Sequence, residues 1–176
     1  MNILRDYQEK AVTEVSRKLA SGKRRVIFQL PTGAGKTVTF AAICNRYITK
    51  SNKSVLIIVH REELLKQTRT TLHNWYGLLS EIINKNMQRA SVYVGMVETL
   101  NNLLKKQPTA LKDVGLIIMD EAHIGNHFKI FDHFPDTFII GFTATPISAS
   151  KKKPLKNYFE DIVCGIDIPE LIESKS

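Results

Sequence analysis

The stretch QLPTGAGKTVTF, residues 29–40, places two glycines and a lysine between two apolar segments. Gly33 and Gly35 allow the backbone to curl so that successive amide N–H groups face inward, while Lys36 and the start of a following helix add positive charge. A turn of this kind between a strand and a helix predicts a cradle for a chain of phosphates. The strict sequence pattern of phosphate-binding loops has Gly or Ala where this chain has Leu30. The alternative to a phosphate cradle is therefore a glycine-rich turn beside an unrelated lysine.

The side chains of this turn have separate expected roles. Lys36 is expected to reach the β and γ phosphates of a nucleotide, and the hydroxyl of Thr37 to ligate Mg²⁺. The nucleotide-binding set predicted from this segment is Thr32, Gly33, Ala34, Gly35, Lys36 and Thr37.

Around the turn, short apolar runs rich in Val and Ile alternate with helix-compatible segments. Runs that are apolar on both faces are typical of parallel strands covered by helices on each side. The expected strands cover residues 25–30, 54–59, 91–94, 114–119 and 137–142. The expected helices cover residues 4–20, 36–50 and 61–75. This order predicts an α/β fold with a doubly wound, mostly parallel sheet.

Composition sets the class of protein. A length of 176 residues suits one domain, and 43% hydrophobic with 24% charged residues is globular composition. The net charge of +8 favours a polyanionic partner, although a basic surface that only keeps the protein soluble is the alternative. Two distant cysteines, no charged leader and no apolar run near ~18 residues predict a cytoplasmic protein without a membrane partner.

A pair of acids follows one of the expected strands. In MDEAH, residues 119–123, Asp120 and Glu121 come directly after an apolar run, at the end of a strand where ligands bind in open α/β sheets. Asp120 is placed to hold Mg²⁺ and Glu121 to orient and deprotonate an attacking water. Such a pair alone is often a polar turn. Together with the phosphate cradle it predicts hydrolysis of a nucleoside triphosphate, with Lys36, Asp120 and Glu121 as the catalytic residues.

These motifs resemble those of superfamily 2 helicases and translocases, and the resemblance covers nearly the whole chain. Five motifs occur in the order of that family: LRDYQ at 4–8, PTGAGKT at 31–37, VHREELLKQ at 59–67, DEAH at 120–123 and GFTATP at 141–146. The wording is closest to the DNA-directed branch that includes UvsW-like and RadD-like helicases and the motor subunits of type I and type III restriction enzymes. The resemblance implies the first RecA-like P-loop motor domain of such a protein.

The resemblance also implies how the nucleotide base and the nucleic acid are recognised. Gln8 would pair with an adenine edge and Arg5 would stack on the ring, which selects ATP; an ordinary exposed helix face is the alternative. Arg61 and Thr99 would contact a nucleic-acid backbone. A surface ion pair with a neighbouring glutamate is the alternative for Arg61, and the carboxylate of Glu98 opposes a phosphate contact at Thr99.

The resemblance implies that three further residues couple the nucleotide site to the nucleic-acid contacts. These are His123, Thr143 and Thr145, and a polar cap where a strand enters a loop is the alternative for the threonines. His123 and His127 have helical spacing, but no cysteine or third histidine accompanies them, so a zinc site is not expected.

The expected organisation is an ATP-binding domain at 1–150, followed at 151–176 by a basic loop and a segment leading toward a missing second motor domain. The expected cofactors are ATP and Mg²⁺, and the expected partners are DNA, with RNA not excluded, and a second RecA-like domain in the same or another chain. We expect the isolated domain to be a monomer that hydrolyses ATP slowly and does not unwind nucleic acid.

Two alternatives remain open from the sequence. One is the motor fragment of a restriction enzyme subunit, which a nuclease motif beyond Ser176 would reveal. The other is a nucleic-acid binding module that does not use ATP.

Overall fold

The computed structural model describes residues 4–30, 35–120 and 130–143, and the backbone of residues 161–164. Its centre is a seven-stranded sheet in which every pairing is parallel, with the strand order β3-β4-β2-β5-β6-β1-β7. The strands are β1 Arg25–Gln29, β2 Ser54–Val59, β3 Glu81–Ile82, β4 Val92–Met96, β5 Val114–Met119, β6 Phe138–Thr143 and β7 Asp161–Cys164.

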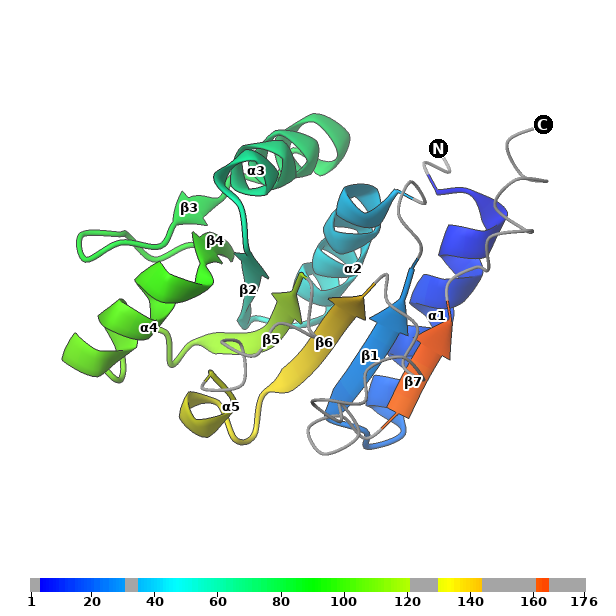
Figure 1. Cartoon of the computed structure of the whole chain (residues 1–176). Coiled ribbons are helices and arrows are strands. Elements are labelled where there is room, and N and C mark those ends of the chain that lie inside the picture. The colour runs from blue at the N-terminus through cyan, green and yellow to red at the C-terminus, as the bar shows by residue number, and fades with distance from the viewer. Residues whose placement is uncertain (1–3, 31–34, 121–129, 144–160, 165–176) are drawn as a thin grey trace.

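Helices cover both faces of this sheet (Figure 1). The helices are α1 Asp6–Ala20, α2 Lys36–Lys50, α3 Glu62–Tyr76, α4 Val97–Lys106 and α5 Ile130–His133. Alternate residues of each strand point to opposite faces, and the buried side chains accordingly divide into two clusters. Along β2, Val55, Ile57 and Val59 pack with α1, α2 and α3, whereas Leu56 and Ile58 pack with α4 and α5. The predicted doubly wound α/β class is therefore confirmed.

The predicted strands and helices are present with small shifts at their ends. The helix expected from residue 4 begins at Asp6, because Arg5 has an extended backbone and acts as its N-cap. The strand expected at 91–94 runs from Val92 to Met96, and α4 follows it directly, a helix the sequence reading did not assign. Strand β7 lies within 151–176 and pairs with β1 in the same sheet.

Aromatic packing fixes the start of α2 over the sheet. The rings of Phe28 in β1 and Phe142 in β6 are stacked with centroids 4.8 Å apart. Phe40, in the first turns of α2, meets Phe142 edge to face at 4.5 Å. All three rings are fully buried. The amino end of α2 is thus held above the adjoining strands β1 and β6.

The far end of α2 rests on β5. Tyr47 in α2 lies so close to Gly115 in β5 that a methyl group at Gly115 would overlap the tyrosine hydroxyl. Between these ends, Cys44 is buried in α2, and burial raises the pKa of its thiol well above the usual range, so the thiol stays protonated. Cys44 is thus a small core residue.

None of the helices in the described ranges combines the length and the apolar character that crossing a bilayer requires.

Candidate functional site

All the strands point the same way, so their carboxyl ends meet at one edge of the sheet. Strand β1 leads into the glycine turn, Asp120 directly follows the end of β5, and β6 ends at Thr143. In the sheet β6 lies between β5 and β1, and the three are in register, with Met119 opposite Gly141 and Thr143 opposite Gln29. The carboxylate and the glycine turn are therefore about two strand spacings, ~10 Å, apart. A long side chain can bridge that gap.

Lys36 bridges it. Its Nζ lies 2.7 Å from Oδ1 of Asp120, whose side chain is fully buried, while the Lys36 side chain is 22% exposed. Lys36 is the first residue of α2 and reaches toward the end of β5, so two motifs that are 84 positions apart in sequence meet at one point. The convergence predicted for the cradle and the acid is present for these two residues.

The second oxygen of the carboxylate has a different neighbour. Nδ1 of His60, the residue after β2, lies 2.9 Å from Oδ2 of Asp120. Neither contact has hydrogen-bond alignment, so within the described residues both buried oxygens of Asp120 have no hydrogen-bond partner. Oxygens of this kind are preferred ligands for a hard cation, and the buried Thr37 at the start of α2 adds a hydroxyl near the same turn. The residues at this point therefore fit a Mg²⁺ ion brought by a nucleotide.

The start of α2 has the features of a phosphate site. Its N-cap is Gly35, which has a left-handed backbone with φ of 77° and ψ of 46° and offers no side chain to cap the helix. The first amide N–H groups of α2 thus lack a side-chain cap, and the helix dipole and the Lys36 ammonium both favour an anion there.

Gln8 packs directly against this turn. Its side chain is 5% exposed, and a methyl group at Gly35 would overlap its Nε2 atom. Its Oε1 accepts a hydrogen bond of 3.0 Å from the backbone N–H of Arg5. The structure thus places Gln8 beside Gly35 of the cradle. Its side chain is buried, whereas the alternative was a residue on an exposed helix face. Arg5 is exposed at the N-cap of α1.

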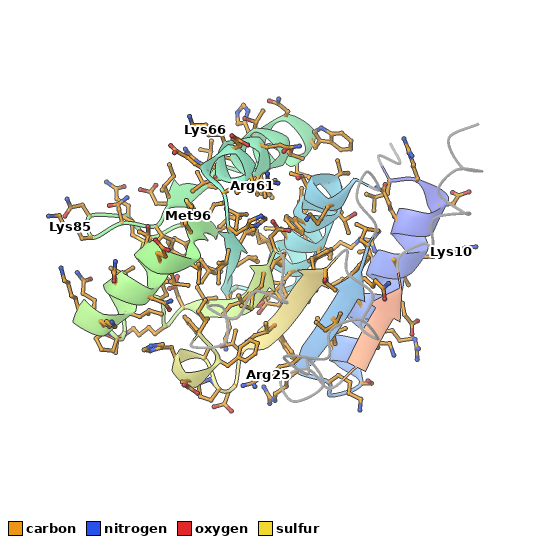
Figure 2. The ribbon with its side chains drawn as sticks, viewed as in Figure 1. Lys10, Arg25, Arg61, Lys66, Lys85 and Met96 are labelled. Atoms are coloured by element: carbon orange, nitrogen blue, oxygen red, sulfur yellow. The ribbon has the colours of Figure 1, made fainter. Side chains whose placement is uncertain are left out.

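The two predicted nucleic-acid contacts share the same edge of the sheet. Strands β2 and β4 are neighbours with Val59 opposite Met96; Arg61 follows β2 and Thr99 lies in the first turn of α4. Arg61 and Thr99 are exposed, and Figure 2 shows Arg61 and Met96 at this end of the molecule. Neither α3 nor α4 has a side-chain cap at its N-terminus. Two helix dipoles therefore present positive ends at this edge.

The alternative for Arg61 was an ion pair with a neighbouring glutamate. Within the described ranges no ion pair of Arg61 occurs, so its guanidinium is available to a ligand. The exposed Glu98 follows Val97 in the same turn as Thr99, so a carboxylate does stand near the proposed phosphate position.

Of the predicted coupling residues only Thr143 is described. It is fully buried at the end of β6, and its backbone oxygen accepts a hydrogen bond of 3.0 Å from the N–H of Leu30. Its role stays a prediction. The other predicted site residues outside the described residues are Thr32, Gly33, Ala34, Glu121, His123 and Thr145.

The opposite edge of the sheet carries a different set of cations. The guanidinium of Arg25 lies over the ring of Phe131, and Arg24 donates a hydrogen bond of 2.6 Å to the backbone oxygen of Asp136. A hollow of about 510 Å³ also opens at this edge, lined in part by Tyr93 and Asp113, and no predicted site residue lines it. Among the described residues no group of three or more His, Cys, Asp and Glu side chains forms a metal cluster. His123 and His127 lie outside them.

Sequence reasoning missed His60. It lies between Val59 and Arg61 in a motif that was otherwise used, but no role was assigned to it. The available signal was its position, because a polar residue directly after a buried strand belongs to the same edge of a parallel sheet as Asp120.

Comparisons with known proteins agree with this geometry. Residues 2–148 match the family described as "Type III restriction enzyme, res subunit". A protein of Saccharomyces cerevisiae described as "Putative ATP-dependent helicase IRC3" is 34% identical over an alignment that covers 98% of this chain and 28% of the relative. The "Type I restriction enzyme EcoAI endonuclease subunit" of Escherichia coli is 27% identical, with coverage of 96% and 22%.

Solved structures share the fold. The UvsW helicase of bacteriophage T4 superposes with a TM-score of 0.72 at 22% identity, covering 91% of this chain and 59% of that chain. A nuclease-deletion mutant of the type ISP restriction-modification enzyme LlaGI, in complex with a DNA substrate mimic, has a TM-score of 0.77 at 17% identity, with coverage of 99% and 21%.

The chain thus spans less than a third of the length of these curated relatives. The family match covers residues 2–148, and within it the structure brings Lys36 and Asp120 together on a parallel sheet of the expected order. The chain therefore belongs to the type III restriction enzyme res-subunit family and is a RecA-like motor domain of the superfamily 2 helicases.

Proposed function

We propose that this domain binds Mg-ATP at the carboxyl edge of its sheet and hydrolyses the nucleotide as the first motor half of a DNA helicase or translocase. The observation that carries the proposal is the 2.7 Å approach of Lys36 Nζ to Asp120 Oδ1, because it brings the cation of the cradle and the metal carboxylate to one point. A phosphate cradle and a metal-binding acid are the two parts that triphosphate hydrolysis needs.

The chain's own residues divide the work. The amides at the start of α2 and the Lys36 ammonium bind the phosphates, and Thr37 and Asp120 hold the metal. Glu121, the residue after Asp120, orients and deprotonates the attacking water. Mg²⁺ held there would neutralise charge on the phosphate oxygens while the terminal phosphoryl group is transferred to this water and ADP leaves.

Full turnover needs a second RecA-like domain, in the same or another chain. In related phosphoryl-transfer enzymes an arginine from a second element is worth ~10³- to 10⁵-fold in rate. We therefore propose that the isolated domain binds ATP weakly, turns it over slowly and does not separate strands.

The test compares ATP binding and ATP hydrolysis by this chain and by a longer polypeptide in which a second RecA-like domain is joined to it. Both are measured alone and with single-stranded DNA, duplex DNA and RNA. The proposal expects binding by both proteins, and nucleic-acid stimulation of hydrolysis only in the longer one. Absence of Mg-ATP binding in both would overturn it, and stimulation by RNA alone would overturn its DNA assignment.

A substitution at Gln8 tests selection of ATP. In Gln8→Glu the side chain still accepts the Arg5 N–H but no longer donates next to Gly35. We expect the preference for ATP over GTP to fall about 5- to 10-fold, the equivalent of one hydrogen bond. Competition binding of ATP and GTP measures the preference. Gln8→Ala is the contrasting variant and should also lower the melting temperature, because it removes the acceptor at the helix start.

A substitution at Arg61 tests the nucleic-acid edge. Arg61→Ala should weaken binding of single-stranded oligonucleotides uniformly across sequences and reduce the slope of log affinity against log salt by about 1. Lys10→Ala is the matched control, since it removes the same charge from the exposed face of α1, which Figure 2 shows far from Arg61. Equal losses in the two variants would mean that net charge, and not this edge, governs binding.

A second candidate is a restriction-enzyme motor that moves along duplex DNA without separating its strands. The family match and the similarity to the EcoAI subunit favour it. Displacement of a third strand from a triplex, without release of a strand from the duplex, would distinguish this motor from a helicase.

A further inference from the structure

Asp120 has two oxygens with two different neighbours. Oδ1 faces Nζ of Lys36 and Oδ2 faces Nδ1 of His60; both side chains are 22% exposed, and the Nδ1 atom itself is buried. The proposed function, on which this inference rests, requires Lys36 to turn to the phosphates and Asp120 to hold the metal. The Lys36 contact must therefore be given up during nucleotide binding, whereas the His60 contact can persist.

The backbone at Asp120 is fixed, but its carboxylate is not fixed by the backbone. The N–H of Asp120 donates a hydrogen bond of 2.8 Å to the carbonyl of Ile58, which continues the pairing of β5 with β2. The last torsion of an aspartate joins an sp³ to an sp² carbon and has a broad, roughly two-fold energy profile. Without a neighbour on Oδ2, the carboxylate could rotate when Lys36 departs.

We propose that His60 is a positioning residue, which holds Oδ2 of Asp120 so that Oδ1 stays directed at the metal site when Lys36 moves to the phosphates. Nδ1 of His60 is buried and, within the described residues, has no hydrogen-bond partner. The Asp120 carboxylate, 2.9 Å away, is the polar group that offsets the free-energy cost of burying Nδ1. A proton on Nδ1 makes the contact attractive, because two facing lone pairs would repel. Neighbours of this kind orient metal-binding carboxylates in many sites.

The position of His60 suits this role. It follows β2 directly, and β2 pairs with β5 up to Ile58 opposite Met119, so the two side chains extend from adjacent strand ends. The contact therefore depends on the rigid sheet and not on a loop. Its own sequence neighbour is Arg61, so the same short segment also carries the proposed nucleic-acid contact.

The experiment measures binding of a fluorescent ATP analogue as a function of Mg²⁺ concentration, and again in excess EDTA, for the wild-type chain, His60→Ala and His60→Asn. In His60→Ala we expect the Mg²⁺ concentration at half-maximal effect to rise about 10- to 100-fold, the usual cost of losing such a neighbour. Affinity in EDTA should stay within about twofold of wild type. His60→Asn places an amide N–H where Nδ1 stands and should restore most of the Mg²⁺ dependence.

The controls separate positioning from stability. His73→Ala removes an exposed histidine near the end of α3 and should leave the Mg²⁺ dependence unchanged. Melting temperatures of all variants are measured without nucleotide. Wild-type Mg²⁺ dependence in His60→Ala overturns the proposal, and so does an equal loss of affinity with and without Mg²⁺. Failure of the wild-type chain to bind the analogue at any Mg²⁺ concentration would instead overturn the proposed function itself.

Discussion

A Lys36→Met variant should lose both nucleotide binding and part of its folding stability. Methionine keeps most of the side-chain volume but removes the cation that lies 2.7 Å from Asp120. The Asp120 side chain is fully buried, so the change leaves a buried carboxylate whose remaining close neighbour on the described elements is His60. Removing one member of a buried pair costs about 3 kcal/mol, or roughly 6–12 °C in melting temperature for a domain of this size.

The matched control is Lys50→Met, at the exposed end of the same helix, which should change neither property. Thermal unfolding measures stability, and titration with an ATP analogue measures binding.

A double variant makes the cause explicit. In Lys36→Met with Asp120→Asn, the buried charge is removed together with its partner, so most of the lost stability should return. Nucleotide binding should not return, because both the phosphate contact and the metal ligand are gone. Asp120→Asn alone should lower Mg²⁺-dependent hydrolysis about 10²- to 10³-fold, as expected for several kcal/mol of lost charge stabilisation. Strictly additive stability losses in the double variant would show that the two side chains do not interact.

Gly35→Ala should have the second largest effect, on the shape of the phosphate cradle. A non-glycine residue with a φ of 77° costs ~1–2 kcal/mol in the left-handed region. The added methyl group would also overlap Nε2 of Gln8, and this amide is held in place because its Oε1 accepts a hydrogen bond from the Arg5 N–H. We expect a lower melting temperature and an affinity for ATP reduced by about tenfold, or ~1.4 kcal/mol.

Two comparisons divide this effect into its parts. Gly77→Ala carries a similar backbone strain, with a φ of 64°, but nothing lies within 4 Å of the added carbon, so it reports the strain alone. A Gln8→Ala background removes the overlap, so Gly35→Ala should cost less stability in that background than in the wild-type chain. If Gly35→Ala and Gly77→Ala lose the same stability and Gly35→Ala still binds ATP normally, the contact with Gln8 has no role in the cradle.

The sequence alone was sufficient to predict the strands whose residues are buried on both faces of the sheet. The runs at 54–59 and 114–119 were predicted at their observed bounds, because continuous apolar strands at the centre of a parallel sheet leave a clear pattern. The two-residue strand β3 at the sheet edge and the four-residue strand β7 were missed, since such short segments carry too little periodicity to identify.

The order of strands and the contacts across it were beyond the sequence. Periodicity does not reveal that β6 lies between β5 and β1, and this placement decides that Thr143 stands between the acid and the glycine turn. The His60 contact was missed for the same reason, because its partner Asp120 lies 60 positions later. Family motifs located the residues of the site, whereas the pairing of the strands determines which atoms meet.

The overlap of Tyr47 with any side chain larger than hydrogen at Gly115 has a consequence for the opposite end of the same two elements. Tyr47 lies 11 residues from Lys36 along α2, a distance of ~16 Å, and Gly115 lies five residues before Asp120, also ~16 Å along its strand. The contact of the Tyr47 hydroxyl with Gly115 therefore helps to set how far α2 lies from β5, and with it the distance between Lys36 and Asp120. A substitution at Tyr47 or Gly115 would therefore change the distance between Lys36 and Asp120, although neither Tyr47 nor Gly115 touches a ligand.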